Sequence, residues 1–212
     1  MFPSHDLTGR IEWAGGKKIG TQGLQIQFES HNDPAYWGGF APIKADGTFF
    51  LPDVMQGTFD LRIAGLPEGY YLRSALLGSL DVTNGLKIGG GAITEPLVVR
   101  VSPAGAQVEG VVMNSGGKLA CTAAVVLIPS GDRRSNRFLY ENSAVDQNGH
   151  YEFKGVTPGD YKLFAFDHAG VVPYFDAAAL SGYENQGQAA HFDAGDRRTV
   201  MLKVIVTGTN NP

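Results

Sequence analysis

The stretch VDQNGHYEFKGVTPGDYKLFAF, residues 145–166, decides the fold. Its apolar residues alternate with polar ones in two runs, 151–153 and 161–165, and a period of two places successive side chains on opposite faces of a strand. Asn148-Gly149 can adopt the positive φ of a tight turn, and Thr157-Pro158-Gly159-Asp160 offers a proline and a glycine between the two runs. The stretch predicts two strands, each with one buried side, joined as a β-hairpin.

The same pattern occurs earlier, in ADGTFFLPDVMQGTFDLRI at residues 45–63. An offset of 102 positions places Asp46-Gly47 on Asn148-Gly149. The other matched pairs are Phe49 and Tyr151, Leu51 and Phe153, Val54 and Val156, Gly57 and Gly159, Phe59 and Tyr161, and Leu61 and Leu163. Turn residues match turn residues and inward apolar positions match each other, so the pattern indicates an internal repeat of roughly 100 residues.

The repeat predicts how the chain divides. At 212 residues the chain is long enough for two domains that each bury a core. The turn-forming segment Ser102-Pro103-Ala104-Gly105 lies between the two copies, so we predict one β-sandwich domain over residues 1–103 and a second over 104–212. The many glycines and prolines suit short strands joined by tight turns. The second domain is expected to carry an insertion, residues 171–188.

Two other strands bear on the core. The continuous apolar run Ala123–Ile128 predicts a strand buried on both faces. The strand expected at 108–113 has Gly110 where the strand at 7–13 has Gly9. The two predicted domains therefore begin in the same way.

One helix-like stretch, Asp176 to Leu180, lies within the expected insertion. Asp176 can cap its N-terminus, and Gly182 can end it. No other stretch of the chain predicts a helix.

Phe164 and Phe166 stand where the first copy has Arg62 and Ala64. Leaving such an aromatic side chain in water costs about 1.5–3 kcal/mol, so something must cover the two rings. The apolar residues of the expected insertion are the nearest candidates along the chain. We expect these residues to fold back over the rings: Val172, Tyr174, Leu180 and Tyr183.

Composition excludes some classes of function and compartment. The net charge of −4, with Lys and Arg scattered apart from Arg133-Arg134 and Arg137, gives no reason to expect a nucleic-acid surface. No apolar run reaches the 18 residues of a membrane span. The single cysteine, Cys121, precludes an intramolecular disulfide and is expected to be buried and inert.

The start MFPSHDLTGR lacks the features of a signal peptide. Its abrupt entry into a strand at Leu7 favours a segment of a longer exported protein over a cytoplasmic one.

With these features in place, the chain resembles tandem carboxypeptidase regulatory-like domains, which are β-sandwich modules of transthyretin-like (prealbumin-like) topology. The resemblance rests on Gly110-Val111-Val112 and on residues 146–153 and 155–161; residues 65–72 and 106–110 stand in the same order in large exported proteins of soil bacteria. It implies an all-β fold of two tandem transthyretin-like or Ig-like sandwiches, to which the sequence adds one short helix in the second. Such modules are usually accessory to peptidases, outer-membrane transporters or adhesin-like proteins, and the resemblance supplies no catalytic residue.

No catalytic or metal-binding motif stands out. The five histidines, at positions 5, 31, 150, 168 and 191, lack metal-ligand spacing. Asp146-x-Asn148-Gly149 is similar to half of a calcium loop, but Gly155 stands where the bidentate Glu is needed. A G-x-S-x-G nucleophile motif is absent. We therefore expect no enzyme activity, no cofactor and no metal.

Aromatic residues form the candidate ligand or partner surface. They are Tyr36, Trp37, Phe40, Tyr70 and Tyr71. Exposed rings would stack on sugars or meet an apolar patch of a partner, whereas buried rings would belong to the cores. The sequence favours the buried alternative.

The leading hypothesis is a non-catalytic structural or interaction module: spacer, assembly or docking domains of a cell-envelope or secreted protein. A protein partner or self-association is expected, because β-sandwiches have edge strands that can pair with another chain. The alternative is a carbohydrate-binding module that uses the aromatic residues. Neither nucleic acid nor membrane insertion is expected.

Overall fold

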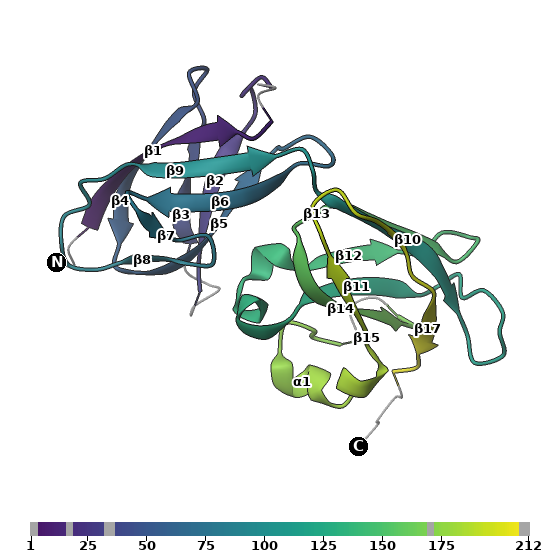
Figure 1. The fold of residues 1–212 in the computed structure, drawn as a ribbon. Coiled ribbons are helices and arrows are strands. Elements are labelled where there is room, and N and C mark those ends of the chain that lie inside the picture. The colour runs from purple at the N-terminus through teal and green to yellow at the C-terminus, as the bar shows by residue number, and fades with distance from the viewer. Residues whose placement is uncertain (1–3, 16–18, 32–36, 169–171, 208–212) are drawn as a thin grey trace. The chain divides into compact units, whose positions relative to one another are not determined.

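The structure is a computed structural model that describes residues 4–15, 19–31, 37–168 and 172–207. The chain divides into two compact units, Met1–Gly105 and Ala106–Pro212 (Figure 1). Each unit has its own cluster of buried apolar side chains. The fold class is the predicted one, all-β with two β-sandwiches and one short α-helix in the second.

The first unit contains a five-stranded and a four-stranded sheet. The five-stranded sheet has the order β4(Thr48–Met55), β1(Ser4–Trp13), β9(Leu97–Ser102), β6(Tyr71–Leu77), β7(Leu80–Asp81). The four-stranded sheet has the order β3(Trp37–Pro42), β2(Gln25–Ser30), β5(Gly57–Ala64), β8(Leu86–Ile88). β1 and β9 pair in parallel, and the other neighbours pair antiparallel.

The inner faces of both sheets build one core. Leu7 and Phe49 enter it from the five-stranded sheet, and Phe28, Phe59 and Leu61 from the four-stranded sheet, all of them buried. This follows from the alternation in the sequence, since one side of each strand is apolar. Two sheets packed face to face over a shared core are a β-sandwich.

The second unit is a single sheet that turns back on itself. The order of its strands is β12(Glu141–Ala144), β11(Ala124–Pro129), β14(Gly159–Phe166), β17(Leu202–Ile205), β10(Ala106–Met113), β13(His150–Val156), with β15(Gln188–Phe192) beside β14 and β16(Arg197–Thr199) beside β10. The helical elements are α1(Ala177–Ser181) and the 3-10 helices η1(Gly131–Ser135), η2(Arg137–Leu139) and η3(Glu184–Gln186). β17 joins the β11–β14 layer to the β10–β13 layer, which encloses a core between them.

The corresponding stretches of the two units have the same pairing. Phe49 of β4 stands opposite Gly9 of β1, and Tyr151 of β13 stands opposite Gly110 of β10. A Cβ on Gly9 would overlap the carbonyl oxygen of Leu97, and one on Gly110 would overlap that of Val200. Each unit therefore needs a glycine where two strand backbones approach closely.

The turn before each of these strands also has the same hydrogen bonds. The Gly47 N–H donates to the Lys44 carbonyl (2.9 Å), as the Gly149 N–H donates to the Asp146 carbonyl (2.9 Å). Both glycines have positive φ, +87° and +69°. Because a left-handed residue is needed in each turn, the Asp-Gly and Asn-Gly pairs of the sequence are explained.

The predicted hairpin is wrong in both units. β13 pairs with β10, whereas β14 pairs with β11, β15 and β17; likewise β4 pairs with β1, whereas β5 pairs with β2 and β8. Each pair of consecutive strands therefore crosses from one layer of the sandwich to the other. Alternation shows which face of a strand is buried, but it does not show which strand receives its hydrogen bonds.

The predictions for the helix and its role are confirmed. Asp176 caps α1, its side chain accepting from the Ala178 N–H (2.8 Å), and Gly182 ends the helix. The helix lies along the β14 side of the second unit (Figure 1). A second buried cluster contains Phe164 and Phe166 together with the four residues predicted to cover them, Val172, Tyr174, Leu180 and Tyr183.

β11 is buried on both faces, as its continuous apolar run predicts. Val125 and Leu127 face the core of the sandwich, while Val126 and Ile128 face the cluster around Phe164. The prediction for Cys121 is wrong, because its thiol is exposed and donates to the Gln147 carbonyl (3.1 Å). The buried run begins only at Ala123, and Cys121 occupies the turn before it.

Candidate functional site

The structure separates the five aromatic residues of the predicted surface. Tyr36 lies outside the described residues, and Trp37 is described only as the first residue of β3. Tyr71 is 7% exposed, and so it cannot offer its ring to a ligand. Tyr70 is partly buried and contacts Trp13 edge to face at 6.2 Å between ring centroids.

Phe40 is the exposed member of this set, with 58% of its surface accessible. It stands opposite Gln27 of β2 on the outer face of the four-stranded sheet. Gln27 accepts a hydrogen bond from Nε of Arg62 (2.6 Å), so the positions level with Phe40 on β2 and β5 are polar. One exposed phenylalanine in a polar setting is an ordinary surface feature, and a sugar site on these residues stays a prediction.

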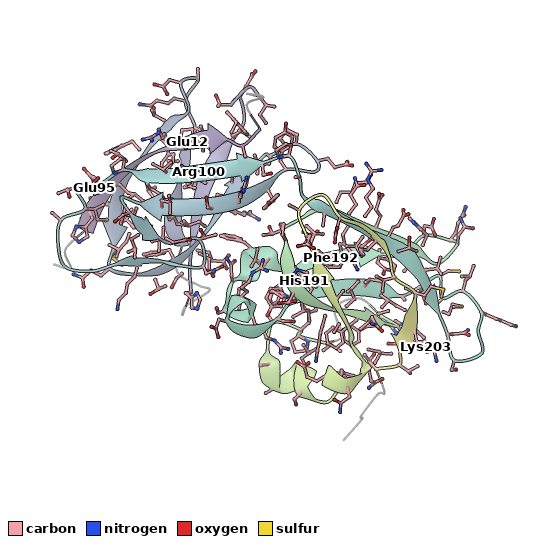
Figure 2. The ribbon with its side chains drawn as sticks, in the orientation of Figure 1. Glu12, Glu95, Arg100, His191, Phe192 and Lys203 are labelled. Atoms are coloured by element: carbon pink, nitrogen blue, oxygen red, sulfur yellow. The ribbon has the colours of Figure 1, made fainter. Side chains whose placement is uncertain are left out.

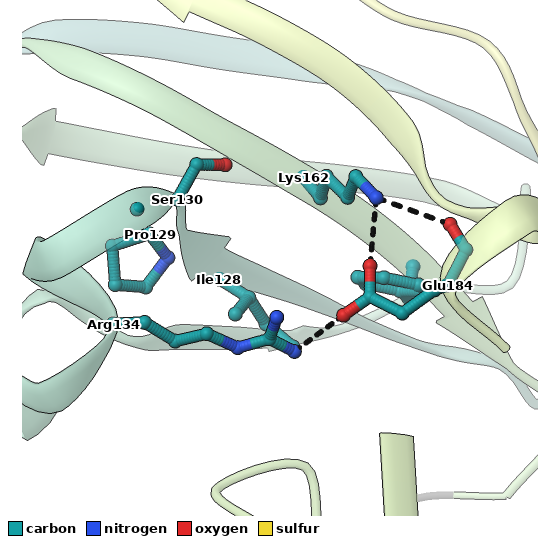
Figure 3. A pocket seen from close by; sticks show the side chains of 8 residues that line it. Ile128, Pro129, Ser130, Arg134, Lys162 and Glu184 are labelled. Atoms are coloured by element: carbon teal, nitrogen blue, oxygen red, sulfur yellow. Dashed lines mark hydrogen bonds and ion pairs between the residues drawn. The ribbon is translucent and has the colours of Figure 1, made fainter. Parts of the chain in front are cut away.

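A pocket of about 170 Å³ opens on the outer side of the second unit. Figure 3 shows Ile128 at its base, with Ser130 and Arg134 on one side and Lys162 and Glu184 on the other. The η1 turn supplies Arg134, β14 supplies Lys162, and η3 supplies Glu184. Elements far apart in the sequence thus form its wall.

Glu184 joins the two basic groups of this pocket. Its Oε2 accepts from Nζ of Lys162 at 2.7 Å, and its Oε1 pairs with Nη2 of Arg134 at 2.6 Å. The Lys162 ammonium also donates to the Glu184 backbone carbonyl (3.2 Å). The hydrogen bond from Lys162 is the main reason that the pKa of Glu184 lies below its usual value. These bonds fasten the segment that follows α1 to β14 and η1.

Four described histidines lie within 4.0 Å of a carboxylate, and two of these pairs are hydrogen-bonded. His191 of β15 is exposed beside buried Phe192 (Figure 2) and lies 2.7 Å from Oδ1 of Asp160, which raises the pKa of the histidine. His31 lies 3.2 Å from Oδ1 of Asp60, a carboxyl that is 2% exposed and whose pKa is raised by burial. Each pair links neighbouring segments of one unit.

Glu141 is the most perturbed acid of the second unit. It stands opposite Leu127, at the edge of the sandwich core, and it is partly buried. Burial raises its pKa to about 7. The negative charge of Glu141 in turn helps to raise the pKa of Tyr161, a shift that comes mainly from the burial of the tyrosine.

The aspartates of the repeated turns act as caps. Oδ1 of Asp146 accepts from the backbone N–H groups of Asn148 (2.8 Å) and His150 (2.9 Å). Oδ1 of Asp46 accepts from the N–H (2.9 Å) and hydroxyl (2.7 Å) of Thr48. Within the described part of the chain, no group of three or more His, Cys, Asp or Glu residues is placed to hold a metal ion.

Sequence reasoning missed the Arg134–Glu184–Lys162 cluster. No short motif links these residues, because they lie 22 to 50 positions apart. One signal was present: the offset of 102 that predicts a repeat places Lys162 on Asp60, so a polar residue occurs at the matching position of β5 and of β14. Its partner lies in a segment where the two copies have no common pattern.

None of the helices in the described ranges has the length and apolar character needed to cross a membrane. No family model matches the chain, and no curated protein matches it.

Several solved structures are similar at low identity. The minor pilin GBS52 of Streptococcus agalactiae is 12% identical, with 99% of each chain covered and a TM-score of 0.39. The shaft pilin spaA of Lactobacillus rhamnosus GG is 10% identical, with 96% of this chain and 97% of the other covered and a TM-score of 0.30. The Bacillus anthracis TIE protein is 12% identical, with 96% of this chain and 34% of the other covered and a TM-score of 0.32. The chain spans about a third of the TIE protein, and these values do not assign it to a family.

Proposed function

We propose that this chain is a non-catalytic structural and docking module of a protein displayed at the cell surface or secreted. The proposal rests on the polar clusters of the described residues, each of which holds parts of the fold together. Glu184 fastens a segment to the sheet, Asp46 and Asp146 cap turns, and Asp60 holds His31. Each cluster stabilises the fold, as expected of a module that holds and spaces other parts.

The architecture supports the same role. Each unit has its own core, and the chain passes from the first unit to the second directly after Gly105, without a long linker. We propose that they are tandem carboxypeptidase regulatory-like domains, with the domain division at or near residue 103 and a segment at 171–188 specific to the second.

The proposed partner is a protein, either another component of the surface assembly or a second copy of the chain. Strand edges supply the means, because unpaired backbone groups on an edge can pair with another chain. Nothing in the described aromatic residues favours a sugar over a protein, so we propose no second function in glycan binding.

Light scattering on the 212-residue chain tests the proposal. We expect reversible association that grows with concentration, or a complex with a component of the parent surface assembly. A chain that stays strictly monomeric at high concentration and binds no such component contradicts a docking role. Turnover of a small substrate by the purified chain, lost on changing a single side chain, would contradict the non-catalytic assignment.

A further inference from the structure

The second unit leaves open a strand edge that the first unit closes. In the first unit, β9 pairs with β1 on one side and with β6 on the other along its length. In the second unit, β16 pairs with β10 alone among the described strands, and β17 gains β14 as a second neighbour only at Val204 and Ile205. One side of the chain from Arg197 to Lys203 therefore has no strand beside it in the described structure.

The backbone geometry shows which groups face that open side. The Asp196 carbonyl accepts from the Gln107 N–H (2.8 Å), and the Val200 N–H donates to the Glu109 carbonyl (2.8 Å). Backbone groups alternate in direction along a strand, so those of Arg197 and Thr199 point away from β10. They are ready-made donors and acceptors for an added strand.

The edge strand carries two basic residues around an apolar centre on its outer face, where Glu109 of the neighbouring β10 stands opposite Thr199. Arg197, Thr199, Met201 and Lys203 are two positions apart and share one face, opposite buried Leu202. All four are exposed, and Met201 reaches 67%; Lys203 is labelled on β17 in Figure 2. Neither Arg197 nor Lys203 forms an ion pair with a described residue, so their charges are available to a partner.

We propose that the β16–β17 edge binds an extended acidic segment of a partner protein, which adds as an antiparallel strand at the place that β6 takes in the first unit. The inference rests on the proposed docking function and names its site and the chemistry of its partner. Carboxylates of the segment stand opposite Arg197 and Lys203, and an apolar side chain stands opposite Met201. Cross-strand pairs of opposite charge stabilise an antiparallel ladder, and main-chain hydrogen bonds supply the rest.

A fluorescent synthetic peptide with the sequence Glu-Thr-Val-Thr-Thr-Thr-Glu in its centre tests the proposal with the full chain. We expect saturable binding that weakens as salt is added, because the charge pairs lie at the surface. The same peptide with Lys in place of both Glu should not bind. Equal binding of the Lys peptide, or no binding of the acidic peptide, overturns the proposal.

Two variants of the β16–β17 edge test whether the peptide binds there, and a third variant, away from the edge, controls for the change of charge. Thr199→Pro removes an outward N–H at an edge position where proline is tolerated, and it should weaken binding about tenfold. Arg197→Glu should weaken it by about fivefold to tenfold. Lys118→Glu makes the same change of charge in an exposed turn of the same unit and should leave the affinity within about twofold. Circular dichroism checks that each variant is folded.

The outcome is separable from that of the proposed function. If the chain associates with itself or with an assembly component and Thr199→Pro leaves that association intact, the edge inference fails while the docking function stands. If Thr199→Pro abolishes self-association but the acidic peptide does not bind, the occupant is a second copy and the inference of an acidic partner segment is wrong.

Discussion

The two units differ in the segment that follows β5 or β14. In the first unit this segment adds strands to a sheet, and in the second it covers the outer face of one. In the first, residues 65–85 contain β6 and β7, which extend the five-stranded sheet beside β9. In the second, residues 167–187 contain α1 and η3, which cover the outer face of β14. β8 and β15 then take the same place, since Ile88 pairs with Gly57 and Phe192 with Gly159.

The outer faces of β5 and β14 carry different side chains. β14 presents Phe164 and Phe166 there, whereas β5 presents Arg62 and Ala64 at the matching positions. Two phenylalanines need a cover, and an arginine does not. The segment that covers this face supplies no strand to the other sheet, and among the described residues no second strand lies beside β16.

The largest expected effect comes from the outer face of β14, which the α1 segment covers. Phe164→Ala should lower the free energy of unfolding of the second unit by about 3–5 kcal/mol, because the ring is buried between β14 and the α1 segment. The matched change Arg62→Ala in the first unit should cost no more than about 0.5 kcal/mol. Urea unfolding of both variants measures the contrast, and equal losses would show that the two faces are not built differently.

The close backbone approaches should be costly in both units. Gly9→Ala and Gly110→Ala each place a methyl group against a carbonyl oxygen of the neighbouring strand, and each should destabilise its own unit by about 1–3 kcal/mol. Gly182→Ala is the control, because its φ of −66° suits alanine and no atom beyond the local backbone lies within 4 Å of the added carbon. Thermal unfolding measures all three. A neutral Gly110→Ala would contradict the equivalence of β1 and β10.

A dependence on pH should distinguish the second unit. The pKa of Glu141 is about 7 in the folded state, above its ordinary value of 4.5, so the folded state keeps a proton that the unfolded state has lost. The free energy of unfolding should therefore fall as the pH rises from 4.5 through 7. Glu141→Gln should remove this loss, a gain of about 1–2 kcal/mol at pH near 8 after allowance for solvent.

Chemical denaturation at several pH values measures this effect. Asp132→Asn, an exposed change in the same unit, is the control. An unchanged pH profile in Glu141→Gln would show that this carboxyl ionises normally.

The turn caps should have the smallest effects. Hydrogen bonds from Thr48 lower the pKa of Asp46, and hydrogen bonds from the backbone N–H groups of His150 and Asn148 lower that of Asp146. Each stabilises the fold above its ordinary pKa of 3.8, and the stability is lost as the pH falls through the depressed folded value. Asp46→Ala and Asp146→Ala should each lower the melting temperature slightly at neutral pH and lose that difference in acid. NMR titration of the two carboxyls checks that both pKa values lie below 3.8.

Much of the architecture follows from local sequence. The alternation in β4, β5, β13 and β14 predicts which side chains enter the two sandwich cores, and the glycines of the turns before β4 and β13 predict positive φ. Phe164 and Phe166, which lie on the outer face of β14, predict their own cover, down to the residues that supply it. These features depend on chemistry within a few residues, or on an apolar face that must be hidden.

The hairpin prediction and the Cys121 prediction are wrong because of information that is not local. Strand pairing depends on how two layers close over a core, and Cys121 lies just outside the buried run rather than within it. The Arg134–Glu184–Lys162 cluster and the open edge of β16 likewise require segments that are distant in the sequence to be placed in space.

The sequence by itself determined the core-facing sides of the strands, the glycine turns and the short capped helix, because side-chain polarity and backbone freedom are properties of each position. The tertiary structure alone decided which strands pair, which salt bridges form and which edge stays open. Hydrogen-bond partners on neighbouring strands are chosen when the whole sandwich closes, and a period of two is compatible with more than one choice.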